Sequence, residues 1–396
     1  QPLTDAARAG EVLPLYVFEP SQWEDTPLSE RHFHFVVESL EELAKGIEGL
    51  DGKLFLAIDE MERVLEKLLD HYYSINLYAH NNSSFMDIVK EWSKQKEQLL
   101  FAYGPELENV PGRLLNKRLN SYLNEPLAEV PNKIDVTSNI PDFLFADFKR
   151  FQKLRFKGNK IRFGQQGGEL KAIETLESFL EGRFENYIEN HQKPLPSSLS
   201  SSRLSAYITW GNISARTIYQ KTVRKLQACE LEEEKVQLEE FLAKLTTRAK
   251  ICSLRMQDQQ PADVNEIKRD YNEEWFRRWL QGRTGIPIID AAMRSLDKTG
   301  WMNFSLRSMV TSFIANTLLL DEHKVSAALA GLYLDYEPAV HDFYIQQQAG
   351  TKGKLKIIDP VKVGRQLDPD GTFIRRYIPE LGRLTEEYIH EPWLYP

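Results

Sequence analysis

The chain has 396 residues, of which 42% are hydrophobic, 27% charged and 11% aromatic. At roughly 150 residues per domain, this length suggests two or three domains, and the composition excludes fibrous and natively disordered classes. Fifty basic residues against 58 acidic ones give a net charge of −8. An anionic partner such as a nucleic acid must therefore meet a local basic patch.

The cysteine content and the hydropathy pattern bear on the compartment. Cys229 and Cys252 form neither a zinc-ligand spacing nor a disulfide framework, which is typical of a reducing environment. No run approaches the roughly 18 apolar residues that cross a bilayer, and no secretory signal pattern opens the chain. We therefore expect a cytoplasmic protein without membrane insertion and without a bound metal.

Short apolar runs alternate with helical patterns over the first hundred residues. The runs cover residues 13–18, 54–58, 75–78 and 99–103, with a helical pattern near 31–46. Between the second and third runs, apolar residues recur at the i, i+3, i+4 spacing of a helix packed on a sheet: Met61, Val64, Leu65, Leu68 and Leu69. This alternation predicts an α/β domain over residues 1–105, with a parallel sheet and flanking helices.

The pattern changes twice after this region. From 106 to 166 prolines punctuate a stretch without a sustained period, which we interpret as an interdomain connector. Beyond Gly167-Gly168 the pattern is almost wholly helical, with apolar stripes over 289–296 and 306–317. We expect an all-helical domain over residues 167–396.

A serine-rich segment, residues 196–202, admits two interpretations. Most such runs are flexible linkers. Here an amphipathic pattern follows at once, from Arg203 to Tyr207. We therefore place the serines at a helix start, where hydroxyls and free backbone N–H groups hold phosphate.

Familiar enzyme signatures are missing from the chain, namely GxxxxGK[ST], GxGxxG, HExxH and GxSxG. The C-terminal half contains other motifs in a fixed order: GRTGIPIIDAAMR at 282–294, TGWM at 299–302, LR at 306–307, DYE at 335–337 and DPDGTFIRR at 368–376. Together they resemble the flavin-binding domain of the DNA photolyase and cryptochrome family, over roughly 167–396. Over residues 1–105 the resemblance rests on LPLYVFEP at 13–20 and the βαβ rhythm. The family has one more strand before the position that matches Gln1, so the first strand is expected to be absent.

The resemblance implies a cofactor and an activity. The cofactor is FAD, folded into a U in the helical domain, and any antenna chromophore stays unassigned. The activity is blue-light-driven repair of cyclobutane pyrimidine dimers, that of a deoxyribodipyrimidine photo-lyase, which is a carbon–carbon lyase. The partner is single- or double-stranded DNA, and the protein is expected to be a monomer. The alternative is a cryptochrome-like blue-light photoreceptor, or a flavin-binding protein, that has lost repair.

Twelve residues match cofactor-contacting positions of the family: Tyr187, Ser201, Ser202, Arg203, Leu204, Ser205, Phe241, Arg248, Arg307, Asp335, Glu337 and His341. The serine hydroxyls suit a pyrophosphate, and the resemblance places an Arg307–Asp335 pair beside the isoalloxazine. His341 stands where the family commonly has an asparagine near flavin N5, and it is expected to donate a hydrogen bond or a charge. Taken singly, each residue has a structural alternative, such as core packing for Phe241 or a structural ion pair for Arg307.

Two features depart from the family pattern. The tryptophan chain that reduces flavin is replaced by Glu322, Ile345 and a residue near Arg269 or Tyr271. Trp275, Trp279 and Trp301 offer another route, although core packing is the alternative. We predict two catalytic residues: Trp279 as the alternative electron carrier, and His341 beside the flavin.

The second departure concerns the lesion pocket and DNA contacts. The family's helix with Glu, Trp, Arg and Glu holds here Lys244, Thr247, Arg248 and Ala249, and Asn303-Phe304-Ser305 replaces His-Asn-Arg. Stacking of a base on an aromatic ring contributes about 1–3 kcal/mol, so the Trp to Thr change weakens lesion binding.

A basic segment favours DNA binding nonetheless. Residues 352–376 carry seven cationic and three acidic side chains, a local charge of +4. We predict that five of them contact DNA: Lys352, Lys354, Lys356, Arg375 and Arg376. The alternative is a solvated charged surface.

Overall fold

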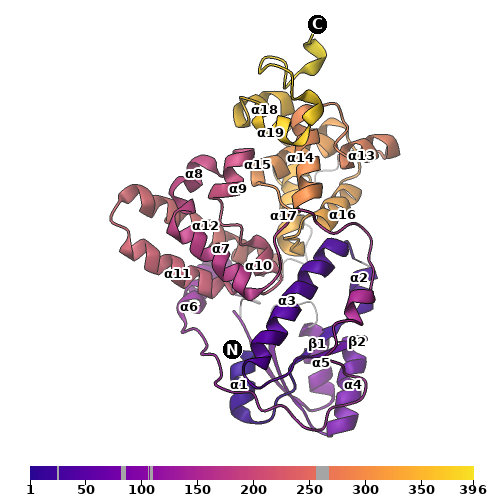
Figure 1. Cartoon of the computed structure of the whole chain (residues 1–396), viewed down its shortest axis with the longest axis vertical. Helices are drawn as coiled ribbons and strands as arrows, with labels where there is room; N and C mark the ends of the chain where they lie inside the picture. The colour runs from indigo at the N-terminus through magenta and orange to yellow at the C-terminus, as the bar shows by residue number, and fades with distance from the viewer. Residues whose placement is uncertain (25, 82–85, 106, 108–109, 256–266) are drawn as a thin grey trace. The chain divides into compact units, whose positions relative to one another are not determined.

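The computed structural model describes residues 1–24, 26–81, 86–105, 107, 110–255 and 267–396, which form two compact units (Figure 1). Unit 1 comprises residues 1–157 together with 167–169 and 215–220. Unit 2 comprises residues 158–166, 170–214 and 221–396.

Unit 1 alternates strands and helices along the chain. In order these are α1 (Pro2–Ala9), β1 (Leu15–Phe18), α2 (Pro20–Glu24), α3 (Glu30–Glu48), β2 (Phe55–Ile58), α4 (Met61–Tyr72), β3 (Asn76–His80), α5 (Met86–Gln95), β4 (Leu99–Tyr103), α6 (Gly112–Asn124) and the 3₁₀ turn η1 (Phe151–Lys153). The predicted α/β class of this region is confirmed.

The strands form two parallel pairs in the described part of the chain, where a single sheet was expected. β1 pairs with β2 in the register Leu15 to Phe55, and β3 pairs with β4 in the register Asn76 to Leu99. The free edge of β2 is met by an antiparallel bridge between Leu56 and Phe145. Because the connector covers this edge, it gives backbone hydrogen bonds to a strand that would otherwise expose them.

The apolar stripe predicted over 61–69 is the face of helix α4 that packs against the strands. Val64, Leu65 and Leu68 are buried on one face, and Val64 and Leu68 pack with Val17 and Phe55 of the β1–β2 pair. In its described part, the connector predicted over 106–166 contains the α-helix α6, whose Leu115, Leu119 and Leu123 are buried at helical spacing.

Unit 2 is helical, as predicted, although Glu169 and residues 215–220, at the starts of two of its helices, are grouped with unit 1. Its elements are α7 (Glu169–Glu181), η2 (Arg183–Asn186), α8 (Tyr187–Asn190), α9 (Pro194–Ser200), α10 (Ser205–Thr209), α11 (Ala215–Ala228), α12 (Glu232–Arg255), α13 (Glu273–Leu280), α14 (Pro287–Thr299), α15 (Phe304–Ser312), the π-helical turn η3 (Phe313–Thr317), α16 (Glu322–Leu332), α17 (Pro338–Ala349), α18 (Pro360–Leu367), α19 (Thr372–Tyr377), η4 (Pro379–Leu381) and η5 (Pro392–Leu394). No helix in the described ranges is long and apolar enough to cross a membrane.

Two of the sequence motifs form aspartate-centred turns that hold helices in place. The carboxylate of Asp290 accepts hydrogen bonds from the backbone N–H groups of Thr284 and Gly285, at 2.7 and 2.9 Å. The carboxylate of Asp368 accepts from the N–H groups of Phe373 and Ile374, at 2.9 and 3.0 Å. These motifs therefore orient α14 and α19, which pack together in the unit 2 core.

Candidate functional site

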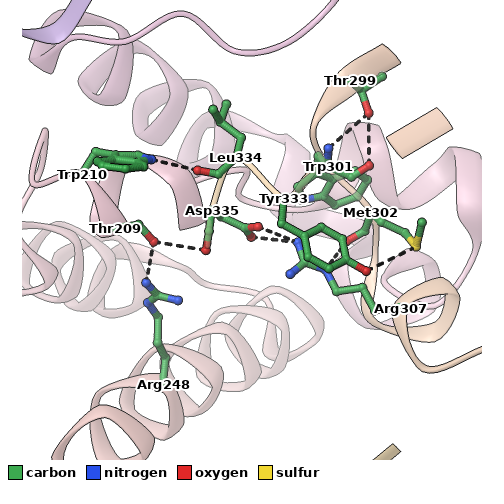
Figure 2. A network of polar contacts seen from close by, with 10 residues as sticks. All are labelled: Thr209, Trp210, Arg248, Thr299, Trp301, Met302, Arg307, Tyr333, Leu334 and Asp335. Carbon is green, nitrogen blue, oxygen red and sulfur yellow. Dashed lines mark hydrogen bonds and ion pairs between the residues drawn. The ribbon is translucent and has the colours of Figure 1, made fainter. Parts of the chain in front are cut away.

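A partly buried ion pair between Arg307 of α15 and Asp335, just after α16, is the centre of a polar network (Figure 2). Nη2 of Arg307 donates to both carboxylate oxygens of Asp335 at 2.8 Å, and Nε donates to the carbonyl of Met302 at 2.8 Å. The guanidinium lies 4.0 Å from the ring centroid of Tyr333. Nη1 forms no hydrogen bond with a described residue, so it remains available to a ligand.

The charge of Asp335 is compensated from several sides. Burial alone would raise the pKa of this carboxyl, but the charge and hydrogen bonds of Arg307 and a hydrogen bond from Ser205 hold the pKa below its usual range. The carboxylate is therefore ionised at neutral pH, and the pair holds its two charges in a fixed orientation.

The network continues to α10 and α12. The hydroxyl of Thr209 accepts from Nη2 of Arg248 at 2.8 Å and donates to the backbone carbonyl of Asp335 at 3.3 Å. The indole N–H of Trp210 donates to the carbonyl of Leu334 at 2.8 Å. These bonds fix the loop that carries Asp335 relative to α10 and α12, as Figure 2 shows.

The serine-rich segment differs in part from its prediction. Ser197 and Ser198 lie inside α9, which begins earlier than expected because Pro194 occupies its first turn, and their hydroxyls donate to carbonyls three residues back. Ser201 and Ser202 lie in the loop before α10. The hydroxyl of Ser201 is buried without a hydrogen-bond partner among the described residues. A buried orphan hydroxyl is costly, and it marks a position where a polar ligand would be stabilised.

His341, on α17, is a neutral imidazole. Burial lowers the pKa of His341 to about 4. Nε2 lies 3.0 Å from both the carbonyl and the hydroxyl of Ser326. Because a carbonyl only accepts, Nε2 carries the proton and Nδ1 is left as an acceptor. This geometry does not favour the donated hydrogen bond or charge that the resemblance implies.

The remaining cofactor candidates fall into two environments. Tyr187 and Phe241 pack with Phe179 in a buried aromatic cluster, with centroid separations of 4.8–6.0 Å. Leu204 is buried just before α10, and Glu337 precedes α17, the helix that carries His341. Arg203 is not joined to the Arg307–Asp335 pair by a hydrogen bond, and its guanidinium lies 4.0 Å from the ring centroid of Trp301.

Glu322, which replaces one of the family's tryptophans, forms an ion pair with Arg269, one of the two candidates for another replaced position. Arg269 binds Glu322 through Nη1, and their side chains are 6% and 13% exposed. Arg269 also donates to the carbonyl of Ala315 at 3.0 Å and to Oδ1 of Asn316 at 3.1 Å, both in the π-helical turn η3. Neither Glu322 nor Arg269 provides a ring for electron hopping, whereas the alternative position, Tyr271, places its ring 6.0 Å from that of Phe276.

Trp279, predicted as an alternative electron carrier, is fully buried in the unit 2 core. Its ring lies 5.9 Å from that of Phe276, and its indole N–H has no hydrogen-bond partner in the described part of the chain. Trp275, on the same helix, is exposed.

The altered lesion-pocket positions lie on α12. Lys244 is exposed and pairs with Glu240 at 3.0 Å. The hydroxyl of Thr247 donates to the carbonyl of Ala243 at 2.8 Å, so it is satisfied within its own helix.

The five predicted DNA-contacting side chains differ in their exposure and in whether they already bind other groups of the protein. Lys354 and Lys356 are exposed in the irregular segment before α18, beside the exposed Leu355 and Ile357. Lys352 is half-buried. The guanidinium of Arg375 instead donates to the backbone carbonyls of Asp370 and Leu384, which is a structural use of this side chain. Arg376 is exposed, 5.9 Å from the ring centroid of Tyr377.

The sequence pattern did not single out three residues of these networks: Thr209, Tyr333 and Ser326. It indicated Arg269 only as a residue near a position where the family has a tryptophan. A threonine or tyrosine inside a helical pattern carries no local signal of its partner. The DYE motif next to Tyr333 was the only available hint.

Comparisons with known proteins agree with this arrangement. The family model for the FAD binding domain of DNA photolyase matches residues 232–396, and the model for DNA photolyase matches residues 1–117. The deoxyribodipyrimidine photo-lyase of Vibrio cholerae is 26% identical, over the whole of this chain and 90% of that protein. That of Alkalihalophilus pseudofirmus is 33% identical over 57% of this chain, and the match spans about half of that protein, 48%.

Solved structures show the same fold. A cryptochrome from Synechocystis superposes with a TM-score of 0.87 at 21% identity, over 100% of this chain and 89% of that one. A class III photolyase from Agrobacterium tumefaciens gives 0.85 at 23% identity, over 99% and 87%. The matching models, the full-length relatives and the shared fold lead to one conclusion: the chain belongs to the DNA photolyase and cryptochrome family and carries its FAD-binding domain.

Proposed function

We propose that this protein is an FAD-dependent, light-driven enzyme that repairs cyclobutane pyrimidine dimers in DNA, a deoxyribodipyrimidine photo-lyase. The observation that carries the proposal is the partly buried Arg307–Asp335 pair, which leaves Nη1 of the guanidinium available. The relatives named as photo-lyases support the substrate class.

The residues fit FAD by their chemistry. The orphan hydroxyl of Ser201 and the neighbouring Ser202 suit a pyrophosphate, and Arg307 suits an anionic or polar ring edge. When bound, FAD supplies the blue-light absorption and the transferable electron that this reaction needs.

The protein residues supply position and electrostatics. Asp335 holds Arg307 in one orientation, and Arg248 with Thr209 holds the loop of Asp335. His341, which packs near Tyr333, remains neutral and adds no charge there. Among the described residues, the charges that act on Tyr333 are those of Arg307 and Asp335. The same FAD site is proposed to be lined by the buried side chains of Tyr187, Phe241 and Leu204. Glu337 is proposed to close one end of the site.

A repair assay tests the proposal. FAD-loaded, chemically reduced protein is mixed with single- and double-stranded oligonucleotides that contain one defined dimer, and is then exposed to blue light or kept in the dark. We expect restored pyrimidines only under light, with the Arg224→Ala variant, altered at an exposed position of α11, as an unaffected control. FAD-loaded protein that shows no photoreversal of either substrate would contradict repair.

A second function has one observation in its favour. Lys244 and Thr247 present no aromatic ring or carboxylate where the family holds a flipped lesion, and both are satisfied within α12. A cryptochrome-like photoreceptor that has lost repair would bind FAD and respond to blue light but leave dimers intact in the same assay.

We also propose that the protein acts on DNA as a monomer, through the exposed Lys354 and Lys356 with Arg376. Lys352 and Arg375 contribute less, because one is half-buried and the other binds backbone carbonyls. Light scattering of the free and DNA-bound protein measures the stoichiometry.

A further inference from the structure

Unit 2 contains a cavity of about 840 Å³ that neither Arg307 nor Asp335 lines. Its walls come from α7, α9, α14, α19 and the segment around Arg203. Its volume lies within the range of about 300–1,000 Å³ that is typical of small-molecule sites. The cavity is therefore large enough for a ligand of its own.

Arg203 is the principal charge in this cavity. Its guanidinium is stacked on the ring of Trp301 at 4.0 Å and forms no hydrogen bond or ion pair with a described residue. Burial, together with the nearby Arg183, lowers the pKa of Arg203 to about 10 against the opposing effect of Asp335, so the group is still cationic at neutral pH. A partly buried cation that forms no direct ion pair is stabilised by an anion.

The other lining charges leave the cavity positive. Lys298 and Arg376 are exposed, and both lie beside the ring of Tyr377, at 5.7 and 5.9 Å from its centroid. The single carboxylate among the lining residues, Glu174, is already paired with Lys171 at 2.8 Å. With Arg183, whose guanidinium already donates to backbone carbonyls, four cations line the cavity against this one paired carboxylate.

Aromatic rings accompany these cations. Trp301 and Tyr377 line the cavity, and Phe163 also lines it with 73% of its surface exposed. An exposed phenyl ring offers a stacking surface for a planar base, which contributes about 1–3 kcal/mol per base. Cations and rings in one cavity are the combination that recognises a nucleotide.

We propose that this cavity binds a nucleoside monophosphate, with its phosphate near Arg203 and its base against the ring of Phe163. Lys298 and Arg376 add positive potential at the mouth. The cavity shares Arg203 with the positions that match cofactor contacts, but neither Arg307 nor Asp335 lines it, and binding there does not depend on repair activity.

The test uses calorimetric titration of the FAD-saturated protein with AMP, with adenosine and inorganic phosphate as separate ligands. FAD saturation removes the cofactor site from competition. We expect AMP to bind more tightly than either fragment, by about tenfold or more, because the phosphate and the base contribute together. Inorganic phosphate that binds as tightly as AMP, or no AMP binding, would overturn the proposal.

Variants at exposed positions localise the binding without disturbing the core. Lys298→Glu should weaken AMP about tenfold, while the matched charge reversal Arg224→Glu, on α11 outside the cavity, should leave it unchanged. Phe163→Ala should weaken AMP but not phosphate. Equal AMP affinity in Lys298→Glu and the unaltered protein, or an equal loss in Arg224→Glu, would show that AMP binds elsewhere and would overturn the assignment.

Discussion

Arg307 and Asp335, 28 residues apart in the chain, form a partly buried pair in which one guanidinium nitrogen donates to both carboxylate oxygens at 2.8 Å. The same guanidinium is held by the carbonyl of Met302 and by the ring of Tyr333. The geometry of the pair is therefore set by the protein itself.

Removing one partner of this pair should destabilise the protein. Asp335→Asn leaves the charge of Arg307 partly buried without compensation, and we expect a loss of about 3 kcal/mol in the free energy of unfolding together with weaker FAD retention. Urea denaturation and the flavin absorbance of the purified protein measure the two effects. The double variant Arg307→Gln/Asp335→Asn should recover part of the stability, and fully additive losses would contradict the coupling.

The hydroxyl of Ser201 offers a change that separates folding from cofactor binding. Because this buried hydroxyl has no partner among the described residues, Ser201→Ala should not lower the stability of the cofactor-free protein, but it should raise the Kd for FAD about tenfold. Ser198→Ala, at a hydroxyl that already donates to Leu195, is the control that should leave FAD affinity unchanged. Fluorescence titration with FAD measures both variants, and unchanged affinity in Ser201→Ala argues against a phosphate contact.

His341 predicts a specific dependence of stability on pH. Its pKa is lowered to about 4, so between roughly pH 6.5 and 4 the unfolded chain binds a proton that the folded chain does not. This group's contribution to stability is therefore present above pH 6.5 and is lost as the pH falls, by about 2 kcal/mol at pH 5. Urea unfolding at pH 7 and pH 5 should show this loss. It should be smaller in His341→Asn and unchanged in His323→Asn, a variant at an exposed histidine.

The Arg269–Glu322 pair should behave unlike a surface pair. Arg269→Leu leaves the carboxylate of Glu322 largely buried without its counter-ion, and we expect a loss of about 3–5 kcal/mol in the free energy of unfolding. The pair of Arg278 with Glu274 is 58% and 59% exposed, so Arg278→Leu should change stability by less than about 1 kcal/mol. Thermal unfolding of both variants side by side gives the comparison, and similar losses would contradict a special role for burial.

DNA affinity should depend on the exposed lysines before α18. Lys354→Ala and Lys356→Ala should each weaken binding to any sequence and lower the slope of log K against log salt by about one. Fluorescence anisotropy of a labelled oligonucleotide over a salt series measures this, with Arg224→Ala as the control. Unchanged slopes in both lysine variants would assign this segment to the solvated surface.

The sequence alone determined the α/β and helical classes, the positions of β2, α3 and α4, and the family. The element classes and positions follow from local periodicity: Val64, Leu65 and Leu68 repeat at helical spacing whatever lies elsewhere in the chain. The family follows instead from the resemblance of the C-terminal motifs. The Arg307–Asp335 pair was implied by the family resemblance, which those motifs carry.

Only the tertiary structure decided which polar groups meet. Arg269 and Glu322 are 53 residues apart and look like two lost tryptophans in the sequence, yet packing against η3 brings them into one buried pair. Likewise, the sequence indicates neither that Nε2 of His341 is occupied by Ser326 nor that Arg203 lies on Trp301. The physical reason is that hydrophobic periodicity is a local property, whereas burial, charge compensation and pKa depend on side chains that distant segments bring into contact.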